Sequence, residues 1–118
     1  MAGDDRERSA LSQLLGHLQH EVRAFDSAEA LLGALDQLEM GVLVTELELP
    51  GQGALELLHA LRERKCQAPT IVLAGETDVA TAVGVIRAGA VDFIQKPIID
   101  RILLRRVRDA LDLPDAGA

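Results

Sequence analysis

The run Gly41-Val42-Leu43-Val44-Thr45 decides the fold class, because it is short, apolar and rich in β-branched residues. Such a run is typical of a strand that is buried on both faces of a parallel sheet. Two further runs have the same character, namely Thr70-Ile71-Val72-Leu73-Ala74 and Val91-Asp92-Phe93-Ile94. We therefore expect these three runs to form strands of one sheet.

Apolar residues at helical spacing separate these runs. A first helix is predicted over residues 6–20, followed by a short, weak strand that contains Val22 and Phe25. Asp26, with Glu29 three residues later, indicates the start of a second helix, which carries Leu31, Leu32, Leu35 and Leu38. Three later helices are predicted by the following residues: Leu55, Leu57, Leu58 and Leu61; Val79, Val83 and Ile86, after a cap at Thr77 or Asp78 and before a stop at Gly89; and Ile102, Leu103, Val107, Ala110 and Leu111.

Strands that alternate with helices predict an α/β fold with a doubly wound parallel sheet. In such sheets the functional site lies beyond the carboxyl ends of the strands. This rule points to Glu46, to the turn Ala74-Gly75-Glu76 and to Lys96. From the residues alone, Glu46 and Lys96 form either an ion pair that holds the loops or a variant of a phosphate or metal site.

Length and charge limit the classes of function. The 118 residues suit one domain, predicted over residues 1–112, with residues 113–118 as a C-terminal tail or the start of a linker. The net charge of −7 argues against nucleic acid as a direct partner. Neither a membrane span nor a secretory signal is predicted, and the lone Cys66 suits a reducing cytoplasm, where we expect the protein.

Three stretches resemble the receiver domain of response regulators, in the CheY-like superfamily. Residues 41–50 resemble the strand and loop of the phosphoacceptor, and residues 71–79 resemble the fourth strand and its loop. The most specific stretch is Arg87-Ala88-Gly89-Ala90-Val91-Asp92-Phe93-Ile94-Gln95-Lys96-Pro97, which is close to the FixJ-type subgroup. The resemblance extends from about Arg8 to Leu111 and implies a CheY/flavodoxin-like sheet and a part in two-component or phosphorelay signalling.

The chain departs from this family at the positions of its chemistry. In the family, an Asp four residues before the loop proline accepts a phosphoryl group, and a Thr or Ser at the end of the fourth strand and a Lys before a Pro contact that group. Here Glu46, which is longer by one methylene, holds the acceptor position, and Ala74 holds the position of the switch hydroxyl. Lys96 remains at the phosphate-contact position. Phe93 holds the aromatic switch position, and we interpret it as a core residue.

The family also holds Mg²⁺ through two acids that follow its first, central strand. That pair would fall near Ala2 and Gly3, so Asp4 and Asp5 are either shifted metal ligands or acids favoured in the first turn of a helix. We prefer the second interpretation and expect no cofactor, with Mg²⁺ bound only if an acidic site survives.

The first, central strand itself is missing or truncated, because only Met1-Ala2-Gly3 precede these acids. Three outcomes follow: the sheet closes up, the gap is filled by another chain, or the protein has low stability.

The resemblance implies a partner surface made by the fourth helix, fifth strand and fifth helix, here about residues 78–89, 91–95 and 100–112. Arg101, Arg105 and Arg108 share one face of the last helix by their spacing. They form either a solvated charged face or a contact with acids such as Asp78 or Asp92 in a homodimer or a protein partner.

The leading prediction is a degenerate receiver, or pseudo-receiver, which is not an enzyme. It would act without phosphorylation, by contact with a histidine kinase, a regulator or an output domain. Glu46 is then either a permanent stand-in for a phosphorylated Asp or a residue that drifted after the chemistry was lost. The alternative is an atypical phosphoacceptor with weak Mg²⁺-dependent activity, as the N-terminal regulatory domain of a transcription regulator. A third hypothesis is a scaffold that borrows its missing strand from another chain.

Overall fold

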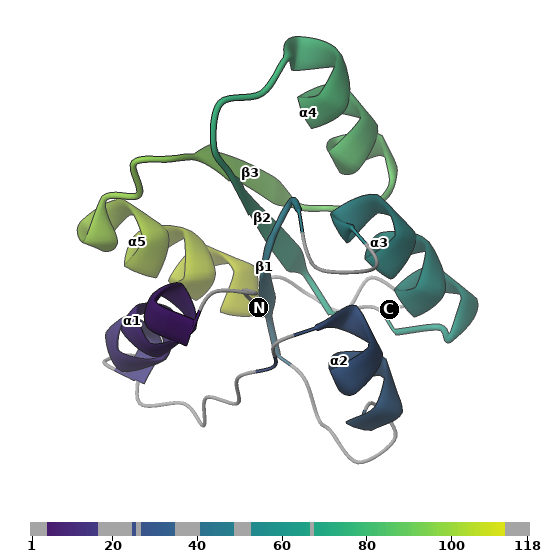
Figure 1. Cartoon of the computed structure of the whole chain (residues 1–118), viewed down its shortest axis with the longest axis horizontal. Helices are drawn as coiled ribbons and strands as arrows, with labels where there is room; N and C mark the ends of the chain where they lie inside the picture. Colours follow the sequence, from purple (N-terminus) through teal and green to yellow (C-terminus); the bar gives the residue numbers. More distant parts are fainter. Residues whose placement is uncertain are drawn as a thin grey trace.

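The computed structural model describes residues 5–16, 25, 27–34, 41–48, 53–66 and 68–112. Helices precede, separate and follow the strands of a parallel sheet (Figure 1). In chain order the described elements are α1 (Asp5–Leu15), α2 (Ala28–Ala34), β1 (Leu43–Glu46), α3 (Ala54–Glu63), β2 (Thr70–Ala74), α4 (Val79–Arg87), β3 (Asp92–Gln95) and α5 (Asp100–Leu111).

The sheet confirms the predicted α/β class and the three predicted strands. Within the described residues its order is β1-β2-β3, and both neighbouring pairs are parallel. The register places Glu46 beside Leu73, and Leu73 beside Ile94. The carboxyl ends of all three strands therefore lie along one edge of the sheet.

The two faces of the sheet are covered by different helices (Figure 1). On one face, Val44 and Ile71 pack in a cluster with Leu103 and Val107 of α5, which Leu11 of α1 joins. On the other face, α2, α3 and α4 supply the covering residues, in clusters that include Leu31, Leu57 and Leu43, and Leu58, Val85 and Val72. Alternate residues of the strands thus face opposite halves of the core, and β2 is buried along its whole length, whereas β3 is only partly buried.

Several helix boundaries differ from the prediction. The α-helical part of α1 ends at Leu15, and residues 17–20 lie outside the described part of the chain. The hydroxyl of Ser27 accepts the N–H of Ala30 at 3.1 Å and caps α2, while the predicted start at Asp26 lies outside the described residues. Residues 22, 35 and 38, and the first four residues, also lie outside the described part, so the Val22 strand and the fate of the first strand stay predictions.

Helix α4 presents a different side to the core from the one that its large residues suggested. Val79, Val83 and Ile86 are exposed, by 79%, 41% and 45%, while Val85 is fully buried. The helix begins after Asp78, which accepts the N–H of Thr81 at 2.7 Å, so Asp78 and not Thr77 is the cap. It ends at Arg87, and the predicted stop Gly89 follows the cap residue Ala88 with a φ of +121°, a value that favours glycine.

None of the described helices is both long enough and apolar enough to span a membrane.

Candidate functional site

The backbone beyond β1 and β3 fixes where the two charged site residues lie. The N–H of Leu47 donates to the carbonyl oxygen of Leu73 at 2.8 Å, and the N–H of Lys96 donates to the carbonyl oxygen of Ala74 at 2.6 Å. These hydrogen bonds continue the parallel ladder past the last strand residues. As a result, the residues that carry Glu46 and Lys96 are held on either side of β2.

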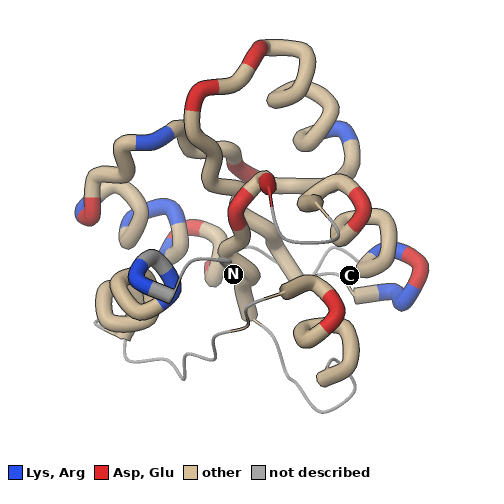
Figure 2. Tube along the Cα trace, viewed as in Figure 1, with Lys and Arg blue, Asp and Glu red and all other residues tan. Residues whose placement is uncertain are grey.

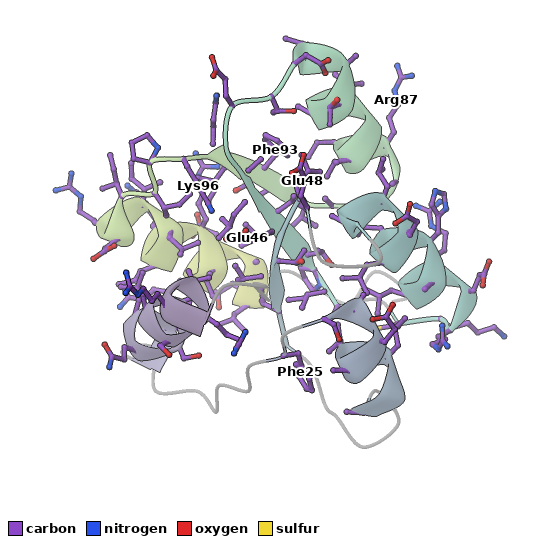
Figure 3. The ribbon with its side chains drawn as sticks, in the orientation of Figure 1. Phe25, Glu46, Glu48, Arg87, Phe93 and Lys96 are labelled. Carbon is purple, nitrogen blue, oxygen red and sulfur yellow. The ribbon has the colours of Figure 1, made fainter. Side chains whose placement is uncertain are left out.

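Glu46 and Lys96 form an ion pair across this edge of the sheet (Figure 3). The Nζ atom of Lys96 lies 2.9 Å from Oε1 of Glu46, and the side chains are 32% and 17% exposed. A charge-assisted hydrogen bond of this length in a partly buried site is stronger than a pair on the surface. The predicted convergence of the two residues is therefore present in the structure, and the pair joins β1 to the loop after β3.

Ala74 lies between them, at the end of the central strand, and is 3% exposed. Its methyl group neither donates nor accepts a hydrogen bond. In the neighbouring strand, Thr45 is fully buried beside Val72, and its hydroxyl donates to the carbonyl oxygen of Glu46 at 3.1 Å. The assignment of Ala74 to the position of the switch hydroxyl stays a prediction from the resemblance, and a methyl group there offers no hydrogen bond to a phosphoryl oxygen.

The donor set of the described residues does not fit a Mg²⁺ ion. No group of three or more His, Cys, Asp or Glu side chains is placed to hold a metal in the part of the chain that is described. The carboxylate of Glu46 contacts an ammonium group, which repels a second cation. Asp4 lies outside the described residues and Asp5 begins α1, so their part as metal ligands stays a prediction.

Phe93 is partly buried and packs against a cluster that includes Leu58 and Val85, on the face of the sheet covered by α3 and α4 (Figure 3). This placement agrees with its interpretation as a core residue. Glu46 lies on the other side, because its neighbours Val44 and Leu73 belong to the cluster with α5.

The predicted partner acids have contacts within the chain. Asp92 accepts two hydrogen bonds from Nη1 of Arg106, at 2.9 and 2.7 Å, and Asp78 caps α4. The hydrogen bond and the charge of Asp92 raise the pKa of Arg106. Sequence spacing did not indicate this pair, because a strand residue and a helix residue fourteen positions apart meet only once the loop between them is placed.

Arg101, Arg105 and Arg108 are exposed along α5, opposite to the buried residues Leu103 and Val107. Figure 2 shows basic residues on α5 and on α1, while the loop after β2 is acidic. The three arginines therefore point away from the core, as their spacing predicted. The structure brings them to neither Asp78 nor Asp92, whose carboxylates contact Thr81 and Arg106.

The parallel sheet, its helical layers and the charged pair at its carboxyl edge define a CheY-like α/β domain. The response regulator receiver domain family matches residues 3–108, and the chain belongs to this family.

Comparisons with known proteins support the FixJ-type subgroup. The transcriptional regulatory protein FixJ of Rhizobium meliloti (strain 1021) is 39% identical over 109 residues, which cover 91% of this chain and 53% of that protein. The chain thus spans about half the length of the curated FixJ relatives.

Two solved structures extend the comparison to the fold. The crystal structure of FixJ-N has a TM-score of 0.88 and 35% identity, covering 98% of this chain and 93% of that one. The BeF3-activated DrrB receiver domain has a TM-score of 0.85 and 27% identity, covering 95% and 93% of the two chains. The chain is therefore a receiver domain of a two-component response regulator, similar to FixJ.

Proposed function

We propose that this receiver domain transmits its signal by protein–protein contact without being phosphorylated. The observation that carries the proposal is the 2.9 Å ion pair between Glu46 and Lys96. The residue at the acceptor position already contacts the lysine that a phosphoryl group would contact. Its carboxylate, longer than that of Asp, is also displaced from in-line attack, and a misplacement of about 1 Å costs orders of magnitude in rate.

Ala74 adds a second argument. A phosphoryl group gains its stability from fixed donors around its oxygens, and a buried methyl group at this position supplies none. The same methyl removes the hydroxyl that would move toward the phosphoryl group. We therefore favour one fixed conformation at the carboxyl edge of the sheet over two conformations that phosphorylation interconverts. Glu46 then supplies the negative charge permanently.

The proposed contact surface consists of α4, β3 and α5. Val83, Ile86 and Val91, in or next to these elements, are each exposed by more than 40%, and large apolar residues exposed in numbers suggest an interaction site. The exposed Arg101 and Arg105 add basic groups from α5. A protein partner, which is a kinase, a regulator, an output domain or a second copy, fits this mixture of apolar and basic groups. The similar protein FixJ is a transcriptional regulatory protein, which suggests that the output is transcription.

The test is to treat the chain with Mg²⁺ and a small phosphodonor, and in parallel with Mg²⁺ and beryllofluoride. We expect no added phosphoryl mass by mass spectrometry and no saturable shifts at Glu46, Ala74 and Lys96 in amide NMR spectra. The DrrB receiver domain, whose solved structure is described as BeF3 activated, is the positive control for the reagent.

A matched variant tests whether Glu46 and Ala74 are the residues that prevent phosphorylation. The double substitution Glu46→Asp with Ala74→Thr restores both positions, and we expect it to gain a response only if the rest of the site, including the Mg²⁺ ligands, survives. Stoichiometric phosphorylation of the unsubstituted chain would contradict the proposal and would support the alternative of an atypical phosphoacceptor.

A further inference from the structure

A cleft of about 520 Å³ opens beside the Glu46–Lys96 pair, between α1 and the loop that joins β3 to α5. Leu11 and Leu14 of α1 and Leu73 of β2 form apolar walls. The volume lies within the range of small-molecule sites, which are mostly apolar and contain a few placed polar groups. The cleft therefore has the size and the lining of a ligand site.

The charged groups of the cleft determine whether it favours a cationic or an anionic ligand. Among the described lining residues, Glu46 and Asp100 are carboxylates, and Lys96 is the ammonium. Lys96 contacts Glu46. Asp100, at the start of α5, makes no ion pair or side-chain hydrogen bond within the described part of the chain. A ligand thus meets a lysine that is already paired and an acid that is not.

We propose that this cleft binds a small organic cation, namely a protonated amine on an apolar body. Its ammonium group pairs with Asp100, and its hydrocarbon lies against Leu11, Leu14 and Leu73. An anion of the same shape is disfavoured, because it approaches Asp100 and must displace Glu46 from Lys96. The proposal does not depend on whether the domain is phosphorylated.

The probe is 2-phenylethylamine, which joins an aromatic ring to a primary amine. Added to the folded chain in an amide ¹H–¹⁵N NMR titration, it is expected to give saturable shifts at Leu11, Leu14, Leu73 and Asp100. The dissociation constant is expected to be about 1 mM, since a ligand with so few atoms gains modest free energy on binding. The matched control is 3-phenylpropanoate, which has a similar body and the opposite charge.

Two substitutions locate the site. Ala10, an exposed residue of α1, lines the cleft, so Ala10→Phe narrows it without burying a large residue in the core. Ala80→Phe, at an exposed position of α4, is the control. Asp100→Asn is expected to weaken binding about threefold, as for an exposed ion pair, with Asp112→Asn at the far end of α5 as its control.

Saturable shifts with the amine that Ala10→Phe removes and Ala80→Phe leaves unchanged would support the proposal. Tighter binding of the carboxylate, binding of neither probe, or shifts that survive Ala10→Phe would overturn it. The phosphodonor experiment is independent of this outcome, so failure of one proposal is distinguishable from failure of the other.

Discussion

At the scale of single residues, the Glu46–Lys96 ion pair links two strand ends at the carboxyl edge of the sheet. It connects β1 with the segment after β3, although β2 lies between those strands. A partly buried pair of this kind stabilises the fold by more than a surface pair, while its desolvation limits the gain.

We expect a coupling free energy of about 1–2 kcal/mol between these two side chains. The measurement is a double-mutant cycle with Glu46→Gln, Lys96→Met and the double substitution, each unfolded in urea. Glu63→Gln, at an exposed position near the end of α3, is the control for loss of a carboxylate. A coupling free energy near zero would mean that the contact adds nothing to stability.

Asp78 makes a pH-dependent contribution at the start of α4. Hydrogen bonds from the side chain and the backbone N–H of Thr81 lower the pKa of Asp78 below its ordinary value of 3.8. A carboxyl group whose pKa is lower in the folded state stabilises that state above its unfolded pKa. The contribution is lost as the pH falls through the folded pKa.

The NMR titration of the Asp78 carboxyl carbon is therefore expected to have its midpoint below 3.8. In urea unfolding, the difference in stability between the unsubstituted chain and Asp78→Asn should shrink as the pH falls from about 5 to about 3. A midpoint above 3.8 would contradict the hydrogen bond to Thr81. Asp109→Asn provides the comparison for an exposed carboxylate in a helix interior.

At the scale of elements, the helix α3 contains neighbouring leucines in opposite environments. Leu57 is fully buried, while Leu55 is 39% exposed. We expect Leu57→Ala to lower the free energy of unfolding by about 2–5 kcal/mol, because the cavity adds to the lost transfer free energy. Leu55→Ala is expected to change it by less than about 1 kcal/mol. Urea denaturation measures both, and equal effects would contradict the placement of α3.

The strands were predictable from sequence, and the inner side of α4 was not. The run at Thr70–Ala74 is apolar on both faces, so its burial was unambiguous, and the structure places the strand at the same residues. In α4 the large β-branched residues Val79, Val83 and Ile86 dominate any periodicity. The structure turns them outward and buries Val85, with partly buried Ala82 and Ala88.

The site was predictable in part for a similar reason. The rule for parallel sheets brings Glu46 and Lys96 to one edge, and the 2.9 Å contact agrees with it. The pairing of Asp92 with Arg106 and the cleft beside α1 depend on loop paths and helix positions, which residue types alone do not specify.

At the scale of the whole molecule, the outward side of α4 exposes large apolar residues, which include Val83 and Ile86. Apolar groups of this size gain free energy when they leave water. A second copy would cover Val83 and Ile86 at high protein concentration, so we expect the chain to self-associate reversibly.

Val83→Asp with Ile86→Asp should reduce this self-association in light scattering and sedimentation, while the far-UV spectrum stays unchanged because both side chains are exposed. Leu55→Asp, on the exposed side of α3, is the control for an added charge. Charge reversal through Arg101→Glu and Arg105→Glu should weaken the same contact. A chain that stays monomeric at all concentrations, or one unaffected by either pair of substitutions, would contradict the homodimer.

The ion pair between Glu46 and Lys96 also has a consequence for the duration of the signal. A phosphoryl group is added and then hydrolysed, so the duration of its message is set by a reaction rate. The glutamate is encoded in the polypeptide and lasts as long as the chain does. Under the proposed function, the duration of the signal depends only on the balance between synthesis and degradation of the protein. The strength of the signal would then follow the number of copies of the protein, and not the fraction of copies that is phosphorylated.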